Sequence, residues 1–153
     1  MKNYMTMFNK AMDVVHGLGI ETGYIVNVSL NYRAKNRFGQ CRRNNVSNTY
    51  SLNFNHLIFD DKADEDAVMS VLIHEILHTC KDCMTHKGEW KRLANIVNAN
   101  TKYNITRCAN YENLGIESPK EERKHNYVFV CEDCGQVIIR ERASKFTKNY
   151  HAY

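Results

Sequence analysis

Residues 64–80, DEDAVMSVLIHEILHTC, are the stretch that decides the fold. Three acidic side chains open it, which suits the positive end of a helix dipole. Apolar residues then recur at helical spacing, and this pattern predicts a buried helix. They are Val68, Leu72, Ile73, Ile76 and Leu77. The same helix carries His74, Glu75 and His78 among these apolar residues.

The pattern His74-Glu75-x-x-His78 is typical of zinc hydrolases. Histidines four residues apart lie one helical turn apart, so both rings can reach one metal ion about 2 Å from each nitrogen. Glu75 lies beside that point and is placed to touch a water on the metal, not the ion itself. The pattern therefore indicates a metal site in which Glu75 is the catalytic base.

A catalytic zinc site needs a third protein ligand and an open fourth position. His86 is the best candidate, because it lies past the expected end of the helix, where the chain can fold back. A metzincin would have a glycine and a histidine where this chain has Lys81 and Met84. Sites of the thermolysin type take a glutamate from a later helix. The alternatives for that role are Glu89 and Glu112.

The periodicity of the remaining chain predicts an α+β domain. Residues 4–18 and 89–100 show helical spacing, whereas residues 24–30 and 50–55 alternate as half-buried strands of antiparallel type. From Tyr127 onward the sequence predicts two short strands around a cysteine-bearing turn. In the first strand, the side chains expected to share one face are Tyr24, Val26, Val28 and Leu30.

The length of 153 residues fits one domain with a small appendage. We predict a core of residues 1–107, a linker or surface loop at 108–126 that holds the only proline, and a C-terminal segment of residues 127–153. The N-terminus lacks the apolar core of a signal peptide, and no stretch approaches a membrane span. We therefore expect a cytosolic protein with no membrane partner.

Six cysteines in a reducing compartment suggest metal ligands more than disulfides where they are closely spaced. Two pairs have CxxC spacing. Cys131 and Cys134 are candidate ligands of a structural metal. For Cys80 and Cys83, packing in the turn before His86 is the favoured interpretation, over a second metal or a redox pair.

Residues 31–43, NYRAKNRFGQCRR, contain five basic residues and no acid. If this segment is extended, Arg33, Lys35 and Arg37 project from one face. Such a patch is a candidate nucleic-acid surface, although solvated charge is the commoner explanation of a basic stretch.

Residues 73–94, IHEILHTCKDCMTHKGEWKRLA, strongly resemble the SprT-like family of zinc metallopeptidases in its short form. The resemblance extends upstream through residues 31–43 and 50–60 and downstream through 103–108 and 127–146. It implies a small zincin-like metallopeptidase domain in which Glu75 is catalytic and Zn²⁺ is the cofactor. The zinc ligands that it implies are His74, His78 and His86.

The resemblance also implies partners and shows two departures. A eukaryotic relative, Spartan, cleaves proteins crosslinked to DNA, so a protein substrate and DNA are the expected partners. The segment His86-Lys87-Gly88-Glu89-Trp90 is one residue longer than the family pattern. Family members commonly end in a four-cysteine zinc ribbon, of which only Cys131 and Cys134 are present here, with His151 at a ribbon-like interval. We therefore expect a partial ribbon.

Three functions stay open at the level of sequence. The first is a zinc endopeptidase that hydrolyses peptide bonds with a metal-activated water. The second is a metal-dependent ribonuclease with three histidines, and the third is a non-catalytic zinc protein that binds nucleic acid. Glu75, placed directly after His74, favours the peptidase.

Overall fold

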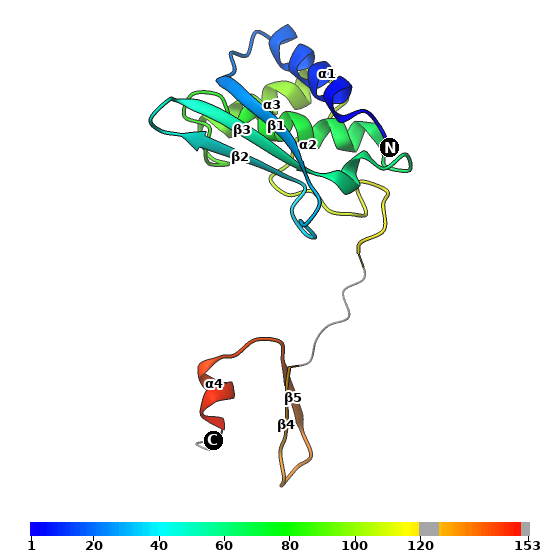
Figure 1. Cartoon of the computed structure of the whole chain (residues 1–153), viewed down its shortest axis with the longest axis vertical. Coiled ribbons are helices and arrows are strands. Elements are labelled where there is room, and N and C mark those ends of the chain that lie inside the picture. The colour runs from blue at the N-terminus through cyan, green and yellow to red at the C-terminus, as the bar shows by residue number, and fades with distance from the viewer. Residues whose placement is uncertain (120–125, 151–153) are drawn as a thin grey trace. The chain divides into compact units, whose positions relative to one another are not determined.

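A small mixed sheet and three long helices form the N-terminal part of the chain (Figure 1). The computed structural model describes residues 1–119 and 126–150. The chain divides into two compact units, Met1–Ser118 and Pro119–Tyr153, and each is described by itself. The elements of the first unit are α1 (Tyr4–Gly17), β1 (Tyr24–Asn31), β2 (Gly39–Asn44), β3 (Thr49–Asn55), a 3-10 turn (His56–Phe59), α2 (Glu65–Leu77) and α3 (Glu89–Asn100). The predicted α+β class is confirmed.

The strand order is β1-β3-β2, with β2 antiparallel and β1 parallel to β3. The prediction of an antiparallel sheet is therefore wrong for the pair β1–β3. The physical reason is β2, a strand that the sequence pattern does not predict: the chain reverses between β1 and β2 and again between β2 and β3, so β1 and β3 run in the same direction. β2 forms a tight hairpin with β3, in which the Asn44 side chain accepts the N–H groups of Val46 and Ser47. Because β2 occupies one side of β3, β1 pairs on the other side.

A β-bulge in β1 changes which side chains face the core. The register with β3 shifts between Ile25 and Asn27, so that Val26 has no direct partner. Tyr24 and Val26 are consequently 74% and 53% exposed, whereas Ile25 packs against the core with Val28 and Leu30. The predicted shared face is thus wrong for Tyr24 and Val26. In β3 the predicted burial of Tyr50, Leu52 and Phe54 is confirmed, and the alternation ends at Asn55, which is buried as well.

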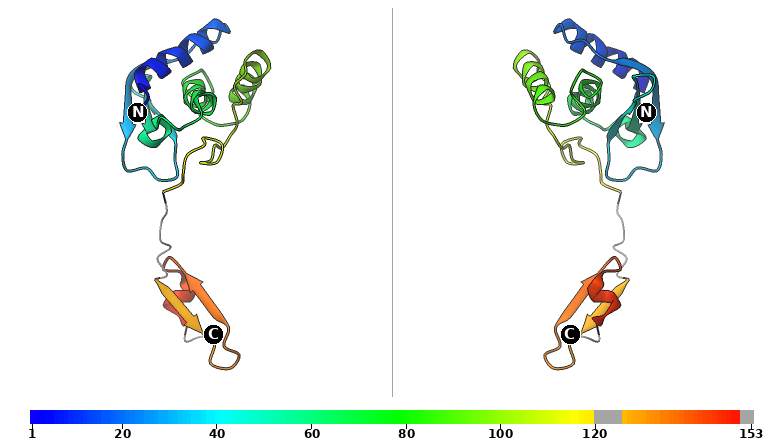
Figure 2. Two further views of the ribbon diagram at one scale, coloured as in Figure 1. Left: turned by 90° about the vertical axis from the view of Figure 1, so that its right-hand side faces the viewer. Right: turned by 90° about the vertical axis from the view of Figure 1, so that its left-hand side faces the viewer.

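The helix α2 is the centre of the first unit. It lies between the sheet and α3 (Figure 2), and it also packs against α1. A helix that is apolar nearly all round is expected to be covered on most sides. The prediction of a buried helix is confirmed, because its buried residues are Val68, Met69, Val71, Leu72, Ile73, Glu75, Ile76 and Leu77.

The predicted third helix is also confirmed. α3 buries Trp90, Leu93, Ala94 and Val97, the four side chains that its spacing placed on one face. The helix follows Gly88, whose φ of 54° lies in the left-handed region that favours glycine. This turn separates α3 from the preceding loop, which carries His86.

Asp64 caps the N-terminus of α2, where its Oδ1 accepts the N–H of Ala67 at 2.8 Å. Replacing Asp64 with alanine is expected to lower the free energy of unfolding by about 1 kcal/mol, because one N–H of the first turn loses its partner. Urea denaturation measures the change. Asp64→Asn keeps an oxygen acceptor and should stay close to wild type; equal losses in the two variants would contradict the capping role.

Residues 108–118 belong to the first unit and pack against the rest of it. Leu114 is fully buried, and its carbonyl accepts the N–H of Asp64 at 2.9 Å. The Tyr111 hydroxyl donates to the Lys35 carbonyl, and its ring meets that of Phe38. Part of the predicted 108–126 linker, residues 120–125, lies outside the described residues.

In the second unit, β4 (Tyr127–Val130) and β5 (Val137–Arg140) form an antiparallel hairpin followed by α4 (Lys145–Lys148). The two predicted strands around a cysteine-bearing turn are therefore confirmed. The Phe129 ring lies 5.1 Å from those of Phe146 and Tyr150, measured between centroids, so one face of the hairpin is packed.

Candidate metal centre

Three histidines converge at the C-terminal end of α2. His74 lies in the last turn of the helix, and His78 is the residue at which it ends. Their Nε2 atoms are 3.3 Å apart. The structure thus places both rings as the helical spacing predicted, side by side and one turn apart.

The loop after α2 brings His86 to the same point. Tight turns shape the loop: Cys83 donates its N–H to the Cys80 carbonyl, and Asp82 has a φ of 60°. The Nε2 atom of His86 lies 2.9 Å from that of His74 and 3.1 Å from that of His78. In the described part of the chain, these three histidines are the one group of three or more potential ligands close enough to share an ion.

Two backbone carbonyls orient the rings. Nδ1 of His74 lies 2.8 Å from the Thr106 oxygen, and Nδ1 of His78 lies 2.6 Å from the Cys83 oxygen. A carbonyl only accepts, so each Nδ1 carries the proton and each Nε2 presents a lone pair. Burial lowers the pKa of His74 to about 4 and also lowers the pKa of His78, so both rings are neutral near pH 7.

This donor set fits a divalent metal ion. Three imidazole nitrogens bound tetrahedrally at about 2.0–2.1 Å lie roughly 3.4 Å from one another, close to the spacing of the three Nε2 atoms. Neutral imidazoles with lone pairs directed at one point repel each other unless a cation lies between them. The residues present therefore fit a three-histidine metal site with room for a further ligand.

The Glu75 side chain lies against the sheet, next to β2. Its side chain is 7% exposed, and its carboxylate accepts the backbone N–H of Cys41 in β2. Burial raises the pKa of this carboxyl to about 7, against the opposing charge of Arg37. A group with a pKa near neutrality suits proton transfer in both directions.

Gly39, the first residue of β2, lies against the Glu75 carboxylate. A Cβ atom on Gly39 would lie 2.5 Å from Cγ and 2.6 Å from Oε1 of Glu75. Gly39 is not among the glycines with positive φ, so the space and not the backbone conformation requires glycine here. The strand thus leaves a gap that is filled by the carboxylate.

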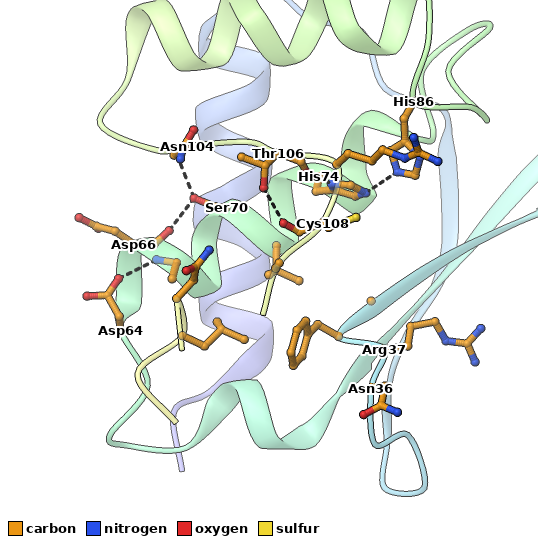
Figure 3. A pocket seen from close by; sticks show the side chains of 18 of the residues that line it. Asn36, Arg37, Asp64, Asp66, Ser70, His74, His86, Asn104, Thr106 and Cys108 are labelled. Atoms are coloured by element: carbon orange, nitrogen blue, oxygen red, sulfur yellow. Dashed lines mark hydrogen bonds between the residues drawn. The ribbon is translucent and has the colours of Figure 1, made fainter. Parts of the chain in front are cut away.

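A cavity of about 670 Å³ opens beside His74 and His86 (Figure 3). Its walls come from residues 36–39, from α2 and its cap, and from residues 102–109 after α3. Figure 3 shows Asp64 and Asp66 at the end far from His86. Asp66 forms an ion pair with Lys102 at 2.7 Å, and Asp64 is the helix cap. The cavity therefore runs from the histidines along α2.

The structure does not bring the alternative ligands to the centre. Glu89 is paired with Arg92 at 2.9 Å on the surface of α3, and Glu112 is exposed on the loop that follows. Cys80 and Cys83 are buried free thiols in the turn before His86, in agreement with the packing interpretation.

Several residues of the site are not predicted by the sequence patterns. The carbonyls of Thr106 and Cys83 carry no sequence signal, because every residue has one. Gly39 did have a signal, since glycine within a strand often marks the close approach of another group. Trp90 was predicted as a buried residue but not as a neighbour of all three histidines, which it is.

Cys131 and Cys134 lie in the turn of the hairpin in the second unit. Both are exposed and free. Hydrogen bonds from the backbone of Cys134 and Asp133 lower the pKa of the Cys131 thiol. Two such thiols supply half of a four-ligand set; His151 lies outside the described residues.

The basic segment does not form the expected stripe. Residues 32–38 form a loop with bends instead of an extended strand, because the Asn31 side chain accepts the N–H groups of Arg33 and Ala34 at 2.8 and 3.0 Å. The segment is therefore not extended, and the condition under which Arg33, Lys35 and Arg37 would share one strand face is not met. Arg37 lines the cavity, whereas the other two do not.

None of the helices in residues 1–119 and 126–150 is both long and apolar enough to span a membrane.

Comparison with known proteins agrees with the site. Neither the curated proteins nor the solved structures contain a match to the chain. The model of the SprT-like family matches residues 5–109, a range that includes the three histidines, Glu75 and Gly39. The chain belongs to the SprT-like family.

Proposed function

We propose that this protein is a zinc-dependent endopeptidase with a small zincin-like catalytic domain. The observation that carries the proposal is the convergence of three Nε2 atoms within 2.9 to 3.3 Å. Two of them lie at the C-terminal end of α2, which also holds the buried Glu75, and the third comes from the loop after that helix. The SprT-like family is associated with metal-dependent protease activity, which supports the same conclusion.

His74, His78 and His86 would hold the ion. When bound there, zinc would supply a Lewis acid that makes water a nucleophile near neutral pH and polarises the peptide carbonyl. Glu75 accepts the proton of the attacking water and returns it to the leaving amine. Its pKa of about 7 lets it act first as a base and then as an acid.

The edge of the sheet offers a place for the substrate chain. β2 is an edge strand, so one side of its backbone is not paired with another strand, and an extended peptide could add to that side where its N–H groups are free of side-chain partners such as Glu75. Gly39 belongs both to this edge and to the cavity beside His74 and His86. An extended peptide along β2 would therefore bring a scissile bond close to Glu75 and the histidines.

DNA-associated or DNA-crosslinked proteins are our proposed substrates within this class, in a cytosolic setting. The exposed basic loop of residues 32–38, next to the cavity wall, supports this choice through its charge. If DNA presents the substrate, cleavage of a DNA-bound protein should exceed that of the free protein and should fall steeply with salt. Equal rates at all salt concentrations would remove DNA from the proposal.

Metal removal and restoration test the function. Protein from which the metal has been removed with a chelator should not cleave unfolded casein, and one equivalent of zinc should restore cleavage. Elemental analysis of the restored protein should find one zinc per chain for the histidine site, or two if Cys131 and Cys134 also bind one. Hydrolysis of RNA but not casein would favour the ribonuclease; zinc binding without either activity would favour the non-catalytic protein.

A further inference from the structure

We propose that Trp90 is a positioning residue that holds the three imidazoles in their metal-binding arrangement. The proposal rests on the metal site of the proposed function. The centroid of the Trp90 indole lies 4.8 Å from the ring of His74, 5.5 Å from that of His78 and 4.7 Å from that of His86. One side chain thus contacts every ring of the site.

Trp90 reaches this place from α3, not from the helix that carries His74 and His78. It is the second residue of α3, and it is 3% exposed. Its Nε1–H is directed at the His74 carbonyl oxygen at 3.5 Å. This distance is long for a hydrogen bond, so the contact orients the indole but contributes little binding energy. The indole therefore joins the helix of two ligands to the segment that carries the third.

His86 depends most on this contact. The rings of His74 and His78 are each fixed by a hydrogen bond from Nδ1 to a carbonyl. For His86, the structure shows no such bond within residues 1–119 and 126–150. The Trp90 ring meets it at an interplanar angle of 84°, which leaves the imidazole an edge-to-face packing partner. Without the indole, the third ligand would lose its main lateral support.

The indole would also stabilise the positive charge that the imidazoles acquire when a metal ion is bound. Metal binding draws electron density from the imidazoles, and the face of an indole attracts positive charge. His78 is stacked on Trp90 at 22°, while the other two rings approach at steep angles. An aliphatic side chain of similar size would fill the space but would not provide this attraction. Aromatic character at residue 90 should therefore affect metal affinity.

Two substitutions separate aromatic support from simple packing. Trp90→Leu should raise the Kd for zinc by about 10- to 100-fold, measured by chelator competition, as for other residues that orient metal ligands. Trp90→Phe should stay within about 5-fold of wild type, because it keeps a ring. Leu93→Ala is the matched control: it opens the same buried face of α3, and it should lower stability but not zinc affinity.

A measurement on the wild-type protein tests the proposal even if the variants do not fold. Trp90 is the only tryptophan of the chain, so its fluorescence reports on this site alone. Addition of Co²⁺ should quench it at one equivalent, and zinc should reverse the quenching. A Trp90→Leu variant that folds and binds zinc within threefold of wild type would overturn the proposal, as would unquenched fluorescence at saturating Co²⁺. Tight zinc binding without peptidase activity would instead contradict the proposed function and leave the role of Trp90 intact.

Discussion

Replacing Glu75 with glutamine is expected to lower kcat for peptide hydrolysis by about 10²–10⁴-fold and to leave zinc content unchanged. Glutamine has nearly the same shape, and its amide oxygen can still accept the N–H of Cys41. The amide cannot accept a proton from water, so the chemical step loses its base. Because burial raises the pKa of this carboxyl to about 7, its site already accommodates the neutral form near pH 7, and a neutral amide should fold equally well.

The measurement is kcat on an unfolded protein substrate, together with zinc content and thermal stability. Glu89→Gln is the control, since Glu89 follows the loop that carries His86 but its carboxylate is partly exposed and paired with Arg92. That variant should keep full activity. If Glu75→Gln were as active as wild type with the same zinc content, Glu75 would not be the base and a different hydrolytic mechanism would be required.

Replacing Gly39 with alanine is expected to lower kcat by about 10²-fold without loss of zinc. The added Cβ would overlap the Glu75 side chain, with the closest atom at 2.5 Å, so the carboxylate must move. The three atoms nearest to this Cβ all belong to Glu75 and none to a histidine, so we expect metal affinity to stay unchanged. The observable is a fall in kcat at constant Kd for zinc.

Gln40→Ala is the matched control, because Gln40 is the next residue of β2 and its side chain points to the opposite face. A double variant sharpens the test. If Gly39 acts only through the position of Glu75, Gly39→Ala should have no further effect on a protein that already carries Glu75→Gln. Additive losses would show that Gly39 contributes in some other way, for example through the substrate backbone.

Local patterns predicted the helices and the ligand pair well. The spacing of residues 68–77 depends only on helix geometry, and so does the approach of His74 to His78. The same holds for the buried face of α3. Such features are encoded within a few residues of one another, so the sequence alone is sufficient to predict them.

Pairing between strands was not predictable in the same way. β2 contains few apolar residues, so its pattern does not resemble a strand, yet its pairing with β3 decides where β1 lies. The bulge at Val26 needs a partner strand before it exists at all. The closeness of Gly39 to Glu75 likewise depends on how the sheet packs on α2. These features arise from tertiary structure.

The hydrogen bond between His78 and the Cys83 carbonyl has a consequence for how the site assembles. His78 uses one ring nitrogen to hold the loop that carries His86, and its other ring nitrogen is directed toward His86. A cation bound at Nε2 would withdraw electron density from the ring and make the Nδ1 proton a stronger donor to the Cys83 carbonyl. Binding of a metal ion would therefore strengthen the attachment of the very loop that supplies the third histidine.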